Sequence, residues 1–570
     1  QRRDARRLMG EHPAKLPHRR PPTHGRSRPT QLSRRARRHP QVPAGAEKEI
    51  MLNRFSLVQF LVFAILGSAS AADFTPAWPQ ANGPYGNYTP RKYGVQLVDD
   101  FSKAKLAWQS ETRDLGFGKG SVSGFLRHLA VWEGHPGSCS GPIVAEGKIF
   151  VSTFRPAGDA LALEQPQFLN YDPAKAKKPY NAEQMVRLMR NLRILGDDLL
   201  VAIDQESGKT AWTAIEAEQG LNRYMGKRQG YCVGPAYFDG VVFSLGTMGM
   251  LRAYKAASGR KIWETPVEPA CAAMKAFKSK SLERQTLPSG TGWDVSLVVA
   301  EGVLIVPMFD GNDVGLRGVN VKTGKTLWEV GKACSRHATP AVWRFDGSEY
   351  VLAATVSGEL RLIDPVDGKV RWVFDGLGEN HFSLTPTHNN LVMVNAGAQR
   401  LRKEGDTRRH GLLAAYRLHP DRPMLAWKHR EAEKILFPTW MDSCARRFLA
   451  VADGKVYYRA HGVEKHGKKL MILAEATGGV LAELPMESPA LQFYPVEDRL
   501  LAIRDASHSD THLAMIGSNP RDFRMLSKEF WNPPHLQTGA YEVYMEFPYA
   551  NGFLYVRTQD GRVACYDLRR

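Results

Sequence analysis

The sequence is poor in cysteine, with six among 570 residues, and no two of them form a C-x-x-C pair. A thioredoxin-type redox pair and a covalently attached c-type haem are therefore unsupported. The sequence also lacks a Gly-rich phosphate loop, a G-x-S-x-G motif and an H-E-x-x-H motif, so it does not indicate nucleotide or hydrolase chemistry. One apolar run, Phe55 to Leu66, is too short to span a bilayer, and no other segment approaches the required length.

The amino-acid composition is that of a chain able to form a folded core. Apolar residues make up 43% of the chain and charged residues 24%, which excludes a chain that is disordered throughout. The frequent glycines (51) and prolines (35) favour short strands joined by tight turns over a helical bundle.

The formal net charge is +19, but residues 1–50 alone hold fourteen Lys or Arg against four Asp or Glu. Arginine pairs, scattered prolines and the lack of apolar periodicity predict an unstructured arm there. Two interpretations stay open: an arm that binds nucleic acid, or an upstream segment that is not translated, with Met51 as the true start. Because a secretory signal begins at Met51, the second is preferred and nucleic acid is not an expected partner.

Residues 51–71 contain the three parts of a secretory signal. Asn53 and Arg54 form a short basic region, the apolar run follows, and Ala69 and Ala71 fit the small-x-small cleavage rule. We therefore predict an exported chain, periplasmic or secreted, that matures near Ala72. A single N-terminal membrane anchor is the alternative, and no transmembrane segment is expected in residues 72–570.

A repeated phrase runs through the rest of the chain: a strand, a polar turn with Gly-Lys or Gly-Arg, and a strand entered by tryptophan. The clearest copies are 202–212, 253–263, 318–328 and 362–372. Looser copies end at Trp427, at Ala482 and near Leu526. The steps between the successive tryptophans 212, 263, 328, 372 and 427 are 51, 65, 44 and 55 residues, which is typical of one four-stranded propeller blade per repeat.

Apolar hairpins precede the phrases and give a second count of the blades, which is eight. They fall at about 140–152, 231–245, 293–308, 337–355, 382–396, 436–459, 490–504 and 544–557. The last copy, Gly561 to Leu568, lacks its second half, and Lys103 to Trp108 supplies a tryptophan-entered strand without a partner. The sequence therefore predicts an all-β fold, an eight-bladed β-propeller over residues 72–570 whose last blade is closed by both termini.

Tryptophan recurs at one position of the phrase. We expect its ring to pack between neighbouring sheets and its indole N–H to find a carbonyl, a structural role rather than a catalytic one. The residues concerned are Trp108, Trp212, Trp263, Trp328, Trp372 and Trp427.

One insertion interrupts the repeats, at about 155–197. Within it, residues 181–195 begin with an asparagine cap and have helical apolar spacing, which predicts a helix. It is either a surface helix or a lid over the mouth of the propeller.

The phrase resembles the A-x-D-x-x-T-G-K-x-x-W repeat of the pyrroloquinoline quinone (PQQ)-like propellers, over roughly residues 75–570. That family includes quinoprotein alcohol dehydrogenases and the propeller of an outer-membrane assembly lipoprotein. For a dehydrogenase, the resemblance implies PQQ in the axial funnel between a tryptophan and an adjacent Cys-Cys disulfide, with calcium held by Glu, Asn and Asp. This sequence has no adjacent cysteine pair, and no calcium triad can be matched to its residues.

Equivalent positions of the innermost strands must encircle the axis, so the residue three before each strand's proline is a candidate ligand. Four consecutive blades place Cys139, Cys232, Asp294 and His337 there. These residue types could bind zinc or copper. The alternatives are a disulfide between Cys139 and Cys232, or cysteines that are simply buried.

Other polar residues lie before and after the predicted inner strands, where propellers bind ligands. They are His128, His135, Arg155, Asp159, Arg336, Glu379, Asn380, His381, Asp505, His508 and Asp510. An intact repeat without a recognisable catalytic set favours a binding or scaffold module that takes a protein or small-molecule ligand through its funnel-mouth loops. The alternative is a PQQ- and calcium-dependent quinoprotein oxidoreductase acting on an alcohol or sugar.

Overall fold

The computed structural model describes residues 77–113, 115, 140–156, 195–221, 233–247, 249–267, 295–310, 313–335, 338–355, 357–375, 384–396, 412–429, 449–460, 469–486, 490–505, 511–533, 547–558 and 561–570. The chain divides after Ala72 into two units, and every described residue belongs to the second, Asp73–Arg570. The insertion predicted at 155–197 is shorter than expected, because its two ends are strand residues. Of the helix predicted at 181–195, Leu195 is the first residue of a strand, and residues 181–194 lie outside the described residues.

The second unit contains eight antiparallel sheets in chain order, and each sheet is one blade. Blade 1 is β2 (Ile143–Ala145), β3 (Lys148–Pro156), β4 (Leu195–Asp204) and β5 (Thr210–Leu221). Blade 2 is β6 (Ala236–Phe238), β7 (Val241–Leu245), β8 (Met250–Lys255) and β9 (Lys261–Pro266). Blade 3 is β10 (Val298–Ala300), β11 (Val303–Asp310), β12 (Asp313–Asn320) and β13 (Thr326–Ser335). Blade 4 is β14 (Ala341–Phe345), β15 (Ser348–Ala354), β16 (Leu360–Ile363) and β17 (Val370–Phe374).

The second half of the unit repeats the pattern. Blade 5 is β18 (Thr385–Pro386), β19 (Leu391–Ala396), β20 (Leu412–Arg417) and β21 (Met424–Lys428). Blade 6 is β22 (Leu449–Ala452), β23 (Lys455–Ala460), β24 (Lys469–Ala474) and β25 (Val480–Pro485). Blade 7 is β26 (Ala490–Val496), β27 (Arg499–Asp505) and β28 (Thr511–Gly517), and blade 8 is β29 (Tyr549–Ala550), β30 (Phe553–Arg557), β31 (Val563–Asp567) and β1 (Lys105–Gln109).

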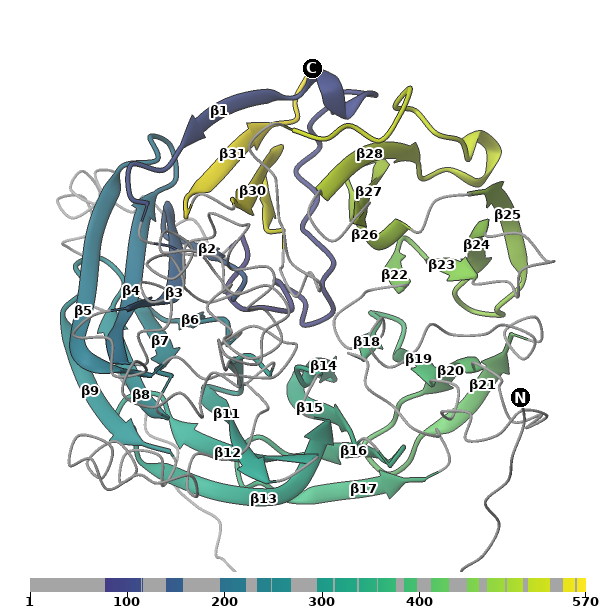
Figure 1. Ribbon diagram of the computed structural model, residues 1–570. Coiled ribbons are helices and arrows are strands. Elements are labelled where there is room, and N and C mark those ends of the chain that lie inside the picture. The colour runs from purple at the N-terminus through teal and green to yellow at the C-terminus, as the bar shows by residue number, and fades with distance from the viewer. Residues whose placement is uncertain are drawn as a thin grey trace, which may run out of the picture. The chain divides into compact units, whose positions relative to one another are not determined.

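The eight blades stand around a ring, with the first strand of each blade innermost and the last outermost (Figure 1). This is the predicted eight-bladed, all-β propeller. The helices among the described residues are two 3-10 turns, η1 (Phe101–Lys103) and η5 (Pro520–Asp522). Of the helical segments that the structure describes, none has the length and hydropathy of a membrane-spanning helix.

The ring closes through both ends of the chain, as the incomplete last repeat predicted. In blade 8 the order is β29, β30, β31, β1, so the outermost strand comes from the start of the propeller. Trp108 of β1 lies opposite Cys565 of β31. The free edge that either end would leave alone is therefore covered.

The six tryptophans of the phrase dock each blade onto the next. Each indole N–H donates to a backbone carbonyl in the outer turn of the following blade, at 2.7–3.2 Å. Trp328 of blade 3, for example, donates to the carbonyl of Pro365 in blade 4 at 2.8 Å. Its ring lies against Gly368, where a Cβ would come within 2.6 Å of Trp328 Cδ2. The glycine of the motif is thus needed for the approach of the ring as well as for its positive φ of 73°.

One blade departs from the prediction of four strands. Blade 7 has three, and its outer edge is covered by residues 523–531 through the isolated bridges Ile516–Met525 and Leu513–Trp531. The segment begins at η5, where Pro520 takes the first helical positions and Asn519 caps the turn. Because the two bridges are separated by irregular chain, the fourth strand is not continuous.

Residues 77–100, which we call the N-terminal strap, form a feature that the sequence did not predict. The strap follows the inner strands around the ring and bonds to all eight blades in chain order. Its contacts are Trp78 with Val144, Pro79 with Tyr237, Gln80 with Val299, Asn82 with Pro340, Asn87 with Pro386, Thr89 with Val451, Tyr93 with Glu497 and Val98 with Leu568. In Figure 1 the strap is the purple chain inside the ring.

Candidate functional site

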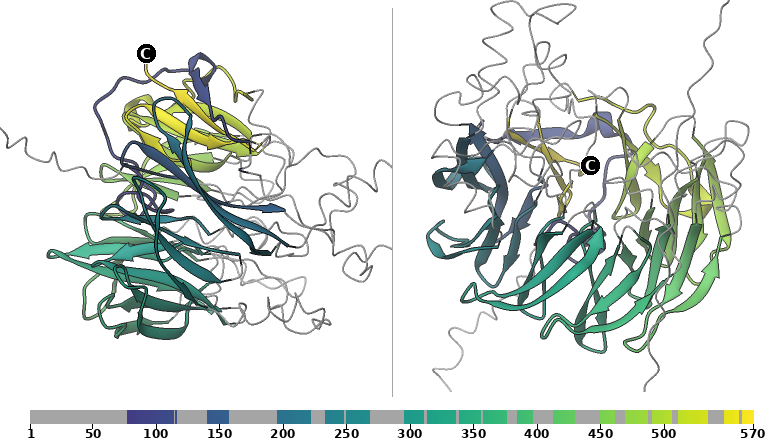
Figure 2. Two further views of the ribbon diagram at one scale, coloured as in Figure 1. Left: turned by 90° about the vertical axis from the view of Figure 1, so that its left-hand side faces the viewer. Right: turned by 60° about the horizontal axis from the view of Figure 1, so that its bottom comes forward.

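The strand ends of the propeller lie at two rims, which differ sharply. At the turn rim, the first and second strands of a blade are joined by tight hairpins such as Ala145–Lys148, where Glu146 and Gly147 both have positive φ. The third and fourth strands also turn there, at the Gly-Lys motif. The other strand ends, such as Pro156 and Leu195, lie at the opposite rim, the loop rim. Figure 2 shows the blades from two further directions.

Most long connections between strands leave the loop rim. The largest there run from β1 to β2, β3 to β4, β9 to β10 and β21 to β22, whereas the long β28–β29 connection starts at the turn rim with the residues that cover the edge of blade 7. No connection between paired strands at the turn rim is of that size in the described blades. Ligand-binding residues gather on loops held by a rigid scaffold, so the loop rim is the candidate binding face.

The predicted metal ligands Cys139, Cys232, Asp294 and His337 lie outside the described residues. The residues that follow them, Ser140, Val233, Val295 and Ala338, are all buried and lead into inner strands of blades 1 to 4 at the loop rim. Among the residues that the structure describes, no group of three or more His, Cys, Asp or Glu side chains is arranged to hold a metal.

Two cysteines are described, Cys334 and Cys565, and both are buried free thiols. Burial raises the pKa of the Cys565 thiol to about 12, helped by the nearby Asp567. A thiol that stays protonated at neutral pH is neither a good nucleophile nor a ready metal ligand, so Cys565 has a packing role.

Most of the other sequence candidates also fall outside the described part of the chain: His128, His135, Asp159, Arg336, Glu379, Asn380, His381, His508 and Asp510. Arg155 lies near the end of β3 and donates to Asp197 of β4 at 2.8 Å. Asp505 is the last residue of β27, which places it at the loop rim.

A buried charge network at the loop-rim end of blades 1 and 2 was missed by sequence reasoning. Arg252 of β8 is 2% exposed and lies 3.4–3.7 Å from the carboxylates of Asp198, Glu216 and Glu264. Its Nη2 donates to Gln219 at 2.7 Å. The sequence signal that could have indicated it is the presence of charged residues, Asp198 and Arg252, within strands whose neighbouring residues are mainly apolar.

Asp198 has a second partner in this network. Its Oδ1 accepts hydrogen bonds from the Thr247 hydroxyl at 2.7 Å and from the Thr247 backbone N–H at 3.1 Å. Burial nevertheless raises the pKa of Asp198, against the opposing effects of Arg252 and Thr247. The network joins two blades, and every charge in it has a protein partner.

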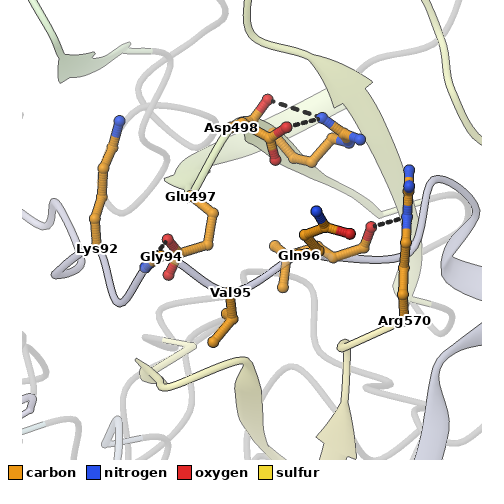
Figure 3. Close-up of a pocket in the computed structure, with 9 residues that line it drawn as sticks. Lys92, Gly94, Val95, Gln96, Glu497, Asp498 and Arg570 are labelled. Atoms are coloured by element: carbon orange, nitrogen blue, oxygen red, sulfur yellow. Dashed lines mark hydrogen bonds and ion pairs between the residues drawn. The ribbon is translucent and has the colours of Figure 1, made fainter.

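At the turn rim, a pocket of about 430 Å³ lies between the strap, the β26–β27 hairpin and the last residue (Figure 3). Glu497 accepts hydrogen bonds there from the backbone N–H groups of Tyr93 and Gly94, both at 2.9 Å. Across the pocket, Arg499 and Arg570 each donate to Asp99 at 2.8 Å.

The charged side chains at this pocket are therefore already bonded to other groups of the protein. Partial desolvation raises the pKa of Asp99, but the hydrogen bonds from Arg499 and Arg570 outweigh it and leave the pKa lowered. Lys92 at the pocket's edge pairs with Asp453 of blade 6. These contacts fasten the strap and the last blade to blades 6 and 7.

PQQ with calcium is the cofactor set that the resemblance implies, and the described residues do not fit it. Each described tryptophan is used in packing: six dock blades, Trp78 lies in the strap, Trp343 packs on Phe345 and Tyr350, and Trp531 packs near Phe101. At the loop-rim ends of the inner strands, the described residues include no carboxylate: most are apolar or small, such as Val233 and Ser296, and Gln492 is an amide, whereas calcium would need several carboxylates and amides together.

Residues 196–380 match the family model of the outer membrane protein assembly factor BamB. Among solved structures, BamB from Moraxella catarrhalis is similar at 14% identity and a TM-score of 0.41, over 65% of this chain and 88% of that one. Quinohemoprotein alcohol dehydrogenase from Comamonas testosteroni is similar at 12% identity and a TM-score of 0.48, over 88% and 81%. A europium-containing methanol dehydrogenase is similar at 11% identity and a TM-score of 0.48, over 85% and 89%.

A search of the curated proteins returned no match to this chain. The match over 196–380 covers strands β4 to β17, where the motif is clearest and each tryptophan docks on the next blade. By their motif and this match, residues 196–380 carry PQQ-like repeats, and they lie within an eight-bladed β-propeller.

Proposed function

We propose that this protein is an exported binding or scaffold module that takes a protein ligand at the loop rim. The observation that carries the proposal is the asymmetry of the two rims. Tight turns join the paired strands at one rim, while most long connections leave the other. A rigid ring that presents variable connections on one face is suited to recognition.

A protein ligand is favoured over a small molecule by the matched family, whose description is an outer membrane protein assembly factor. The described inner-strand ends also offer no titratable set for chemistry on a small substrate. Binding there would use the connections of several blades at once.

Photo-crosslinking tests the position of the binding face. A photoreactive amino acid replaces Ala217 or Lys332, exposed residues near the loop-rim ends of β5 and β13. The matched controls are Asp239 and Asp346, exposed residues of turn-rim hairpins. Adducts with a partner protein are expected from the first pair and not from the second, and the reverse pattern would contradict the proposal.

The competing function, a PQQ- and calcium-dependent oxidoreductase, is tested on the same purified protein. Incubation with PQQ and calcium, followed by an alcohol or a sugar and an artificial electron acceptor, is expected to give no dye reduction above the protein-free rate. Sustained turnover would replace the binding proposal with the enzymatic one.

Export is proposed from residues 51–71, whose basic, apolar and small-residue parts are those of a secretory signal. The mass of the mature protein purified from its producing cell is expected to place its first residue near Ala72. A mature chain that retains residues 1–50 would contradict export by this signal and would reopen the nucleic-acid interpretation of the arginine-rich arm.

A further inference from the structure

The outermost strand of blade 5, β21, has an open edge with two adjacent exposed apolar residues, as β25 of blade 6 also has in Val480 and Leu481. Met424 and Leu425 are adjacent on β21 and are 46% and 57% exposed. Both pair with β20 on one side only, Met424 with Arg417 and Leu425 with Tyr416. An edge strand presents unpaired backbone N–H and C=O groups that a further strand can use.

The charges around β21 differ from those around β25. In blades 3 and 6, a cation of an outer strand pairs with a carboxylate of the neighbouring strand, as in Arg317–Glu329 and Lys469–Glu483, both at 2.6 Å. In blade 5, Arg417 and Arg422 are exposed, and neither forms an ion pair within the described part of the chain. Lys428 adds a third positive charge at the other end of the strand.

The turn before β21 departs from the motif as well. The other clear copies have Gly-Lys or Gly-Arg at this turn, whereas blade 5 has the sequence His419-Pro-Asp-Arg-Pro423. The carbonyl of His419 still accepts the docking bond from Trp372 at 3.0 Å, so the blade keeps its place in the ring. This turn also supplies the exposed Arg422.

We propose that β21 is a second docking surface, to which an extended segment of a partner protein adds as a fifth strand, with acidic residues alternating with apolar ones. Because Met424 and Leu425 face opposite sides of the sheet, the apolar residues of that segment would cover Leu425. Its carboxylates would lie on the other face, which holds Met424 and its register partner Arg417, and would also reach Arg422 in the preceding turn. A second copy of this chain is a poor occupant, because two β21 edges would bring like charges together.

The test uses the full chain and a fluorescein-labelled peptide of alternating valine and glutamate. Fluorescence anisotropy is expected to show saturable binding, weakened about tenfold by the double variant Arg417→Glu, Arg422→Glu. The matched control is Arg260→Glu, an exposed turn arginine of blade 2 that has no side-chain partner within the described residues. It is expected to leave binding unchanged. A peptide with lysine in place of glutamate is expected to bind at least about tenfold more weakly.

Hydrogen exchange locates the peptide. Amides of 424–428 are expected to exchange more slowly with the peptide bound, while those of β17 and β25 do not change. Three results would each overturn the proposal: no saturable binding, an equal loss with Arg260→Glu, or protection confined to other strands. The loop-rim crosslinks are independent of this surface, so the two proposals can fail separately.

Discussion

The carboxylate of Glu497 accepts a hydrogen bond from the backbone N–H of Tyr93, 404 positions earlier in the chain, at 2.9 Å. The same carboxylate accepts from Gly94 and from the hydroxyl of Tyr549, so one buried side chain joins the strap, blade 7 and blade 8. A contact between such distant parts of the sequence closes a very long loop, and its loss releases all three elements.

Replacing Glu497 by alanine is therefore expected to lower the free energy of unfolding by about 1–3 kcal/mol, because three donors lose their acceptor and one of them, the Tyr549 hydroxyl, is buried. Thermal unfolding followed by circular dichroism measures the loss. Asp239→Asn is the control, since Asp239 is an exposed acidic residue of another turn-rim hairpin. Equal stability of the two variants would mean that the strap is not fastened at Glu497.

The docking of Trp328 on Gly368 is tested by adding one methyl group. Gly347→Ala places a Cβ in open space at φ 77° and is expected to cost about 1 kcal/mol of stability through backbone strain alone. Gly368→Ala has a similar φ but sets the Cβ within 2.6 Å of the indole, so a larger loss, about 2–4 kcal/mol, is expected. Chemical denaturation of both variants gives the difference, and equal losses would contradict a close approach of the ring.

Asp198 gives a pH-dependent prediction. Because burial raises the pKa of Asp198 in the folded protein above its ordinary value of 3.8, folding binds a proton as the pH falls through the raised value. The contribution of Asp198 to stability therefore increases with acidification, until the unfolded chain also protonates near 3.8. The stability of the wild type relative to Asp198→Asn is expected to rise as the pH falls. A pH-independent difference would mean that Asp198 stays ionised when folded.

The predicted metal site at Cys139, Cys232, Asp294 and His337 can be tested by measuring the metal content of the purified protein. If these residues bind zinc or copper, purified protein carries the metal, and the double variant Cys139→Ser, Cys232→Ser loses it. Elemental analysis of the two proteins decides. Cys334→Ser is the control, because Cys334 is a buried free thiol of β13 and is not part of the predicted set. A metal-free wild type would end the idea.

The thiol of Cys565 is expected to resist modification in the folded protein, because it is buried and its pKa is raised to about 12. Reaction with a thiol reagent at neutral pH should modify equal numbers of thiols in the native wild type and the native Cys565→Ser variant. After unfolding, the variant should show one fewer, and a difference in the native state would contradict burial.

The blade count, the closure and the docking residues could be predicted from the sequence because each follows from a local pattern. Trp212, Trp263 and Trp328 mark their blades at regular intervals, and the half-repeat at Gly561 needs the strand at Trp108. The strap could not be predicted in this way. It bonds through backbone groups and through Asn82 and Asn87, at spacings set by the ring and not by its own sequence.

The candidate site was less predictable for a related reason. Asp198 and Arg252 belong to different blades, and nothing in their own segments indicates that they meet. Blade 7 shows that a poor match to the motif also carries information. The copy of the motif near Leu526 is a loose one, and the corresponding outer strand is irregular. A clear motif predicted a regular blade, while contacts between repeats required coordinates.

The strap has a consequence for how the molecule is made. Its residues leave the ribosome before any blade exists, yet their final partners, Glu497 and Leu568, are among the last to be translated. The end of the strap therefore stays without its final partners until the last residues of the propeller have been synthesised. A truncated product would leave both the strap's end and β1 without partners, which would distinguish it from a finished protein.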